Sequence, residues 1–210
     1  MSDRAILFVD GNNWYHALKA IGMTGLLQLD YSKVATKLVG PRQWVGTRYY
    51  VGRVTQTGNP KLYAAQRRFV AALESSDPRV SVHFGRLETR LIVNPAVKEL
   101  RQLLSRLPVR LDPTIYRALS DLAAKHEHAS VIQEKAVDVM LAVDLVILAE
   151  RNQFDTAYLL SADGDFTPAV EAVRRLGKRV YAVSARPGEQ LASVVNAFVR
   201  VDRSWFADCS

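Results

Sequence analysis

The sequence predicts an α/β protein with a doubly wound, mostly parallel sheet and a helical insertion. Short apolar runs of strand length alternate with segments of helical periodicity, as in parallel sheets whose strands are connected by helices. Two of these runs end in aspartate-containing turns, at Asp10 and at Asp163. A chain of 210 residues can bury a substantial core, so we expect one domain over 1–210.

The first half of the chain supplies three expected strands. Residues 5–9 form a continuous apolar run that is too short for a helix and predicts a buried strand. Residues 48–51 and 80–84 are rich in aromatic and β-branched side chains, which favour strands. Helical patterns fill the connections at 12–21, 31–39 and 61–74. We expect Asn12 or Asn13 to cap the first of these helices.

The second half continues the alternation after an interruption. Residues 90–130 have a helical pattern without strand signals, so we expect an insertion of two helices separated near Pro108 and Pro113. The clearest helix covers 134–151. Apart from Asp138 and Asp144, residues 136–149 are all apolar, which predicts a helix buried on most sides. The remaining expected elements are strands at 157–161 and 179–184, helices at 168–176 and 188–198, and a short edge strand at 199–201.

The net charge of +7 is unevenly distributed. Residues 40–125 hold 15 Lys/Arg and 6 Asp/Glu, a balance of +9, whereas the rest of the chain holds 13 and 15, a balance of −2. A basic surface beside an acidic pocket suits a nuclease that acts on a phosphate backbone. A solvated arginine-rich face would have the same composition, so charge alone favours nucleic acid only weakly.

Several classes of protein are excluded or disfavoured by the sequence. Cys209 is the only cysteine, which excludes an internal disulfide framework and fits a reducing cytoplasm. The most apolar segment, 137–149, is too short to span a bilayer, and the N-terminus lacks a signal-peptide pattern. No dinucleotide-binding, P-loop or GxSxG motif occurs. We therefore expect a cytoplasmic protein that does not bind membranes.

Aspartates at the ends of two expected strands indicate a divalent-metal site. Ligands bind at the carboxyl ends of the strands in open α/β sheets, where Asp10 and Asp163 are expected. Clustered carboxylates repel one another unless a cation joins them, and oxygen ligands suit Mg²⁺ or Mn²⁺. Asp138, on the apolar helix, needs a partner if it is buried, and we expect it to converge with the other two on one cation. A turn or helix cap is the alternative role for Asp10, and Asp165 is better placed than Asp163 to cap the helix that follows.

Other polar residues are assigned more general roles. Asp144 lies about 120° around the helix from Asp138, so it is expected to accept an internal hydrogen bond or ion pair instead of sharing the metal. Tyrosines near the arginines of the basic segment could stack on bases, or belong to an ordinary strand and helix. The arginines concerned are Arg48, Arg53, Arg67 and Arg68.

Three motifs together resemble the NYN domain family, in its LabA-like branch, within the PIN-like nuclease superfamily. They are Phe8-Val9-Asp10-Gly11-Asn12-Asn13, Lys135-Ala136-Val137-Asp138-Val139 and Ser161-Ala162-Asp163-Gly164-Asp165-Phe166, followed by the segment 174–180. The motifs occur in the family's order, and matching segments cover about 1–87 and 131–202. Ala136 stands where the family usually has glycine. The helical stretch 90–130 is longer than the family core.

The resemblance implies a PIN-like parallel sheet and a metal-dependent ribonuclease. Asp10, Asp138 and Asp163 would bind Mg²⁺ or Mn²⁺, with Asp165 as a fourth carboxylate. Asn12 would orient the substrate or a water molecule. The four arginines of the basic segment would contact the RNA backbone.

Two alternatives remain open at the level of sequence. Asp163-Gly164-Asp165-Phe166-Thr167 satisfies the DxDxT motif of haloacid-dehalogenase phosphohydrolases, but no later acidic pair follows. The chain could also be a non-catalytic RNA-binding or scaffold module with a relic acidic pocket. The sequence does not determine whether it forms homo-oligomers or binds a protein partner through 90–130.

Overall fold

The computed structural model describes residues 3–23, 29–54, 59–106 and 112–209. The chain divides into two compact units, one formed by 1–86 with 134–210 and the other by 87–133. The strands are β1 (Arg4–Asp10), β2 (Gln43–Gly52), β3 (Val80–Val93), β4 (His128–Lys135), β5 (Thr156–Leu160), β6 (Arg179–Ser184) and β7 (Ala197–Arg200). The α-helices are α1 (Gly11–Ala20), α2 (Tyr31–Val39), α3 (Pro60–Ser76), α4 (Pro95–Arg106), α5 (Pro113–Lys125), α6 (Val137–Glu150), α7 (Thr167–Arg175) and α8 (Glu189–Val194), with 3-10 turns η2 (Gly164–Phe166) and η3 (Ser204–Phe206).

The strands form one sheet in the order β4-β3-β2-β1-β5-β6-β7, and every neighbouring pair from β3 to β7 is parallel. The chain starts at the centre with β1, proceeds outward to β2 and β3, and returns beside β1 as β5 before it proceeds the other way. This confirms the doubly wound α/β prediction. The reversal of direction between β1 and β5 is the switch point, where open α/β sheets bind ligands.

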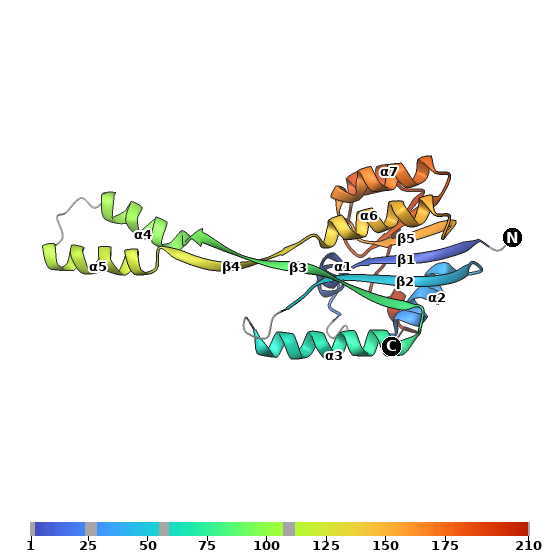
Figure 1. The fold of residues 1–210 in the computed structure, drawn as a ribbon, viewed down its shortest axis with the longest axis horizontal. Helices are drawn as coiled ribbons and strands as arrows, with labels where there is room; N and C mark the ends of the chain where they lie inside the picture. The colour runs from blue at the N-terminus through green and yellow to red at the C-terminus, as the bar shows by residue number, and fades with distance from the viewer. Residues whose placement is uncertain (1–2, 24–28, 55–58, 107–111, 210) are drawn as a thin grey trace. The chain divides into compact units, whose positions relative to one another are not determined.

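Helices cover both faces of the sheet, and the strand side chains alternate between the two cores. Leu7 packs in one core with residues of α1 and α2, whereas Phe8 packs in the other with residues of α6 and α7. Figure 1 shows α6 and α7 on one side of the strands and α2 and α3 on the other. Because both faces are covered, the central strands are continuous apolar runs, which is why β1 was predictable.

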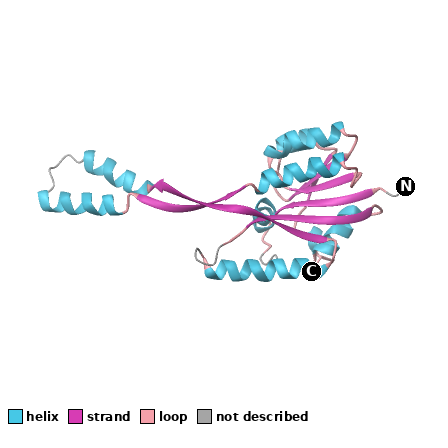
Figure 2. Cartoon of the chain, in the orientation of Figure 1, coloured by secondary structure: helices cyan, strands magenta, loops and turns pink. Residues whose placement is uncertain are grey.

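The smaller unit contains the two predicted helices, α4 and α5 (Figure 2). The expectation that 90–130 lacks strands was wrong, because β3 runs on to Val93 and β4 begins at His128 beside it. The strand β4 is an edge strand of the sheet, at the opposite end from β7. An edge strand has only one neighbour, so its sequence lacks the continuous apolar run of the central strands.

The helix α6 packs against the core over most of its surface, which agrees with the prediction that it is buried on most sides. Its buried residues recur every four positions from Val137 to Ala149. Val139 and Val143 on another face are 64% and 48% exposed, and Asp138 is exposed as well. Other apolar side chains of α6 are partly buried and pack against the same core, so the two exposed valines are exceptions; these partly buried residues are Met140, Ala142, Val146 and Leu148. In the described part of the chain no helix is both long and apolar enough to cross a membrane.

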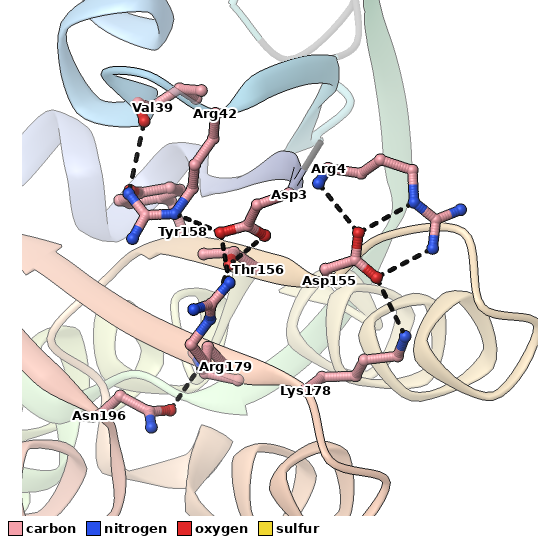
Figure 3. Close-up of polar contacts among 11 residues, drawn as sticks. Asp3, Arg4, Val39, Arg42, Asp155, Thr156, Tyr158, Lys178, Arg179 and Asn196 are labelled. Carbon is pink, nitrogen blue, oxygen red and sulfur yellow. Dashed lines mark hydrogen bonds and ion pairs between the residues drawn. The ribbon is translucent and has the colours of Figure 1, made fainter. Parts of the chain in front are cut away.

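Ion pairs join the amino ends of the strands (Figure 3). Asp3 accepts hydrogen bonds from Arg42 Nε at 2.7 Å and from Thr156 Oγ1 at 2.9 Å, and it also pairs with Arg179. Asp155 accepts from the Arg4 side chain and backbone and lies 3.5 Å from Lys178 Nζ. At this edge of the sheet both aspartates are therefore neutralised by cations.

Candidate active site

Three of the predicted site residues lie where β1, β5 and α6 meet. Asp10 is the last residue of β1, and Asp163 follows β5 by three residues. Val9 pairs with Leu160, so β1 and β5 leave the sheet at the same level. Asp138 is the second residue of α6, the helix that leads into β5. Asp10 and Asp163 thus belong to turns at the switch point.

Asp10 is held in place by its neighbours. Asp10 is 3% exposed, and its carboxylate accepts hydrogen bonds from the Asn13 backbone N–H at 3.1 Å and the Ser161 hydroxyl at 3.0 Å. Asp10 is therefore the N-cap of α1, and the prediction that Asn12 or Asn13 caps this helix was wrong. The helix begins immediately after the strand, so the last strand residue occupies the capping position. Asn12 is exposed in the first turn of α1.

Asn13 and Ser161 connect the turns, and sequence reasoning assigned neither of them to the site. The Asn13 side-chain oxygen accepts a hydrogen bond from the Ala162 backbone N–H at 3.2 Å. The buried Ser161 hydroxyl donates to Asp10 and accepts from the Asp163 backbone N–H at 3.1 Å. Ser161 is a polar residue at the end of an otherwise apolar strand, and this was the available signal.

Asp163 and Asp165 have the reverse of the expected capping roles. The Asp163 carboxylate accepts from the Asp165 backbone N–H at 2.9 Å and caps η2, whereas α7 has no side-chain cap. The prediction that Asp165 is the better placed cap was wrong, because a short 3-10 turn begins at Gly164. The cap must precede that turn, so Asp163 occupies it and the Asp165 side chain is exposed.

The carboxylates of the site interact electrostatically. Burial, with smaller contributions from the charges of Asp138 and Asp163, raises the pKa of Asp10 to about 6 against the opposing effect of its hydrogen bonds. Partial desolvation also raises the pKa of Asp138, together with the charges of Asp163 and Asp165. All four predicted catalytic carboxylates therefore lie in one negative field.

Aspartates at the two edges of the sheet have opposite electrostatic environments. At the amino edge the Arg4 guanidinium lowers the pKa of Asp155 far below its ordinary value. At the carboxyl edge no described cation forms an ion pair with Asp10, Asp138 or Asp163. A site with concentrated negative charge and no protein cation suits an external cation or a developing positive charge.

A hard divalent cation fits this donor set chemically, because all the candidate ligands are oxygens. Within the described residues, however, no three His, Cys, Asp or Glu side chains lie close enough to hold one ion. The expected convergence of Asp10, Asp138 and Asp163 is thus not formed as the side chains stand. Asp10 and Asp163 are fixed by hydrogen bonds, whereas Asp138 has no hydrogen-bond partner in the described part of the chain.

Ala136, which precedes α6, adopts a left-handed conformation with φ 70° and ψ 0°. An alanine in this region costs about 1–2 kcal/mol, whereas glycine enters it freely but loses about 0.5–1 kcal/mol of chain entropy. We expect Ala136→Gly to raise the free energy of unfolding in urea by about 0.5 kcal/mol. In the same helix, Ala142→Gly should lower it by about 1 kcal/mol. A loss of stability in Ala136→Gly would contradict the inference that the left-handed backbone conformation of Ala136 is strained.

The four predicted RNA-contacting arginines occupy different places. Arg48 Nη2 lies 2.8 Å from an Asp144 oxygen that also accepts from the Tyr50 hydroxyl at 2.7 Å, which confirms Asp144 as an internal acceptor. Arg53 and Arg67 line one pocket, and the exposed Arg68 is not among its lining residues.

Comparison with known proteins gives one family match and two similar solved structures. The family model described as "NYN domain" matches residues 4–202. A crystal structure of a protein of unknown function from Vibrio parahaemolyticus has a TM-score of 0.57 at 19% identity, covering 96% of this chain and 94% of that one. An isopentenyl phosphate kinase in complex with substrate has a TM-score of 0.34 at 10% identity, with 91% and 93% covered. No curated protein matches the chain.

Proposed function

Because this chain belongs to the NYN domain family, whose members are nuclease-like, we propose that it is a metal-dependent ribonuclease that hydrolyses RNA phosphodiester bonds. The observation that carries this proposal is the group of aspartates at the switch point. The charges of neighbouring aspartates contribute to the raised pKa values of Asp10 and Asp138, and neither residue forms an ion pair with a described cation. A cation bound at such a site would stabilise the ionised carboxylates and offset their mutual repulsion.

Asp10, Asp138 and Asp163 would hold a Mg²⁺ or Mn²⁺ ion, with Asp165 as a fourth carboxylate. A bound divalent ion supplies an activated water and offsets negative charge on the reacting phosphate. Asp10 offers a carboxylate fixed by Asn13 and Ser161. The exposed Asp138 side chain would turn toward it to complete the site.

The remaining predicted residues would bind RNA. Residues 40–86 contain eight Lys/Arg and two Asp/Glu, so the basic excess of the larger unit lies in β2, α3 and their connections. Arg48, Arg53, Arg67 and Arg68 would contact the phosphate backbone, and exposed Asn12, adjacent to Asp10, would orient the substrate.

The test is cleavage of labelled single-stranded RNA with Mn²⁺, with Mg²⁺ and with chelator. We expect metal-dependent cleavage that falls at least about 1000-fold in Asp163→Asn, since Asp163 would be a metal ligand. Asp121→Asn is the matched control, because Asp121 is an exposed aspartate on α5, in the smaller unit. It should cleave like the wild type.

Binding of RNA without cleavage under any metal would replace the proposal with a non-catalytic RNA-binding module. Turnover of a small phosphoester without RNA cleavage would instead favour a phosphohydrolase. Equal loss of cleavage in Asp163→Asn and Asp121→Asn would show that the assay reports general damage and not the site.

A further inference from the structure

A pocket of about 300 Å³ lies between one face of α3 and the end of β2, beside β3. Its polar and aromatic lining residues are Arg53, Tyr63, Gln66, Arg67, Glu74 and Phe84, and the others are aliphatic. The α3 residues recur at intervals of three, four and seven, so they share one face of the helix. The pocket therefore combines an apolar floor with two arginines and one carboxylate.

Both arginines lie over aromatic rings. The Arg53 guanidinium is 4.8 Å from the Phe84 ring centroid, and that of Arg67 is 5.9 Å from the Tyr63 centroid. Neither guanidinium forms a hydrogen bond or ion pair with another described residue. Each guanidinium is a planar cation with an aromatic ring on one side. Its N–H groups donate no hydrogen bond to a described residue, so they are available to a ligand.

Gln66 fixes the segment that carries Arg53. Its side-chain nitrogen donates to the Gly52 carbonyl at 2.6 Å, and its oxygen accepts from the Val54 N–H at 2.8 Å. Both backbone neighbours of Arg53 are thus tied to α3. Less conformational entropy is then lost when a ligand binds, because the arginine already extends from a fixed backbone.

We propose that this pocket binds one unpaired nucleotide of a single-stranded RNA, with the base stacked on a guanidinium–aromatic layer and the neighbouring phosphate on the arginine N–H groups. A volume of about 300 Å³ is at the small end for ligand pockets and accepts one planar base. Duplex RNA keeps its bases paired and stacked, so it cannot fill the pocket without opening. The proposal rests on the proposed function, because it names the class of RNA used.

The position of the pocket suits a strand that also reaches the carboxylates. Asp10 pairs in register with Tyr50, and Arg53 lies three residues further along in the same direction. At about 3.3 Å per residue the offset along the sheet is about 10 Å. Both sites thus lie beyond the carboxyl ends of neighbouring parallel strands, within reach of one short RNA.

The experiment measures binding of a fluorescent eight-nucleotide RNA by anisotropy in chelator, and cleavage separately with Mn²⁺. Arg53→Ala and Arg67→Ala should each weaken binding about tenfold, as loss of a stacked base does. Arg151→Ala removes the same charge from an exposed residue at the C-terminal end of α6, outside the pocket, and should weaken binding less than about threefold. Arg53→Lys keeps the charge but lacks the planar group, so it should resemble Arg53→Ala.

The possible outcomes distinguish the proposed nucleotide pocket from the proposed ribonuclease activity. Wild-type binding in both alanine variants, equal weakening in Arg67→Ala and Arg151→Ala, or no RNA binding by the wild type would overturn the proposal that this pocket binds RNA. Competition by duplex RNA that is as effective as competition by single-stranded RNA would also overturn it. RNA binding that depends on the pocket residues, without metal-dependent cleavage, would support the proposed pocket and refute the proposed nuclease activity. Arg67 is exposed, so its variant tests the pocket even if Arg53→Ala fails to fold.

Discussion

Replacing Asp10 with asparagine is expected to stabilise the protein by about 2 kcal/mol at neutral pH while abolishing RNA cleavage. Asp10 is 3% exposed, and burial raises its pKa from 3.8 to about 6. Ionising it in the folded state therefore costs about 3 kcal/mol. Asparagine avoids that cost but disturbs the Ser161 hydrogen bond, worth about 1 kcal/mol. Urea unfolding at pH 7.5 measures the difference.

The stability difference between Asp10→Asn and the wild type is expected to change with pH in a defined direction. Because the folded-state pKa of Asp10 is raised, the folded protein retains a proton that the unfolded chain has released. The contribution of Asp10 to stability is therefore greatest below about pH 4 and falls as the pH rises to about 6. Asp10→Asn lacks this fall, so its advantage over the wild type should grow between pH 4.5 and 7. An advantage that shrinks over this range would contradict the raised pKa.

Without metal, Asp10→Asn is expected to be more stable than the wild type, and a bound divalent ion should reverse this order. A cation that binds the folded wild type relieves the repulsion among its carboxylates and stabilises it by mass action. Millimolar Mn²⁺ should raise the melting temperature of the wild type and of Asp121→Asn, but not that of Asp10→Asn. An equal rise in all three proteins would indicate that the ion binds elsewhere.

Adding one methyl group at Gly11 is expected to destabilise the protein by about 2–3 kcal/mol. A Cβ atom there would lie 2.6 Å from Tyr49 Cε1 and 2.6 Å from the Tyr50 carbonyl oxygen. Tyr49 is 1% exposed and the other contact is backbone, so neither can move without displacing the core. Gly11→Ala should therefore lower the free energy of unfolding measured in urea. It should also reduce cleavage, because Gly11 adjoins Asp10.

Whether Gly11→Ala lowers or raises the free energy of unfolding tests how closely α1 approaches β2. In a helix with room for the methyl group, glycine to alanine gains up to about 1 kcal/mol. A gain in Gly11→Ala would thus contradict the close approach between α1 and β2. Lys19→Ala in the exposed last turn of the same helix is the control and should change stability by less than about 0.5 kcal/mol.

The central strands and the family motifs were readable from sequence for a physical reason. A parallel strand covered on both faces must be apolar throughout, so β1 and β5 appear as short continuous runs that end in polar residues. The carboxyl ends of such strands gather at one edge of the sheet, which is why Asp10 and Asp163 could be assigned to the same region. The extension of β3 and the strand β4 had no such signal.

The details of the site depended on contacts between distant segments. Capping by Asp10 and Asp163 follows from where α1 and η2 begin, a matter of one or two residues that propensities do not resolve. The roles of Ser161 and Asn13 come from hydrogen bonds across about 150 residues of sequence, which no local pattern encodes. Asp138 was expected to be buried because its helix is apolar, but it lies in the first turn of α6, where it is exposed.

The α/β class, the succession of central strands and helices along the chain, and the aspartates at the strand ends all follow from the amino-acid sequence, because burial periodicity and strand-end chemistry are local. Three-dimensional packing was needed to establish that Arg48 pairs with Asp144, that Arg53 and Arg67 share a pocket, and that burial and neighbouring carboxylates raise the pKa of Asp10. Pairing, pocket formation and electrostatic coupling depend on distances between residues far apart in the chain, and folding alone sets those distances.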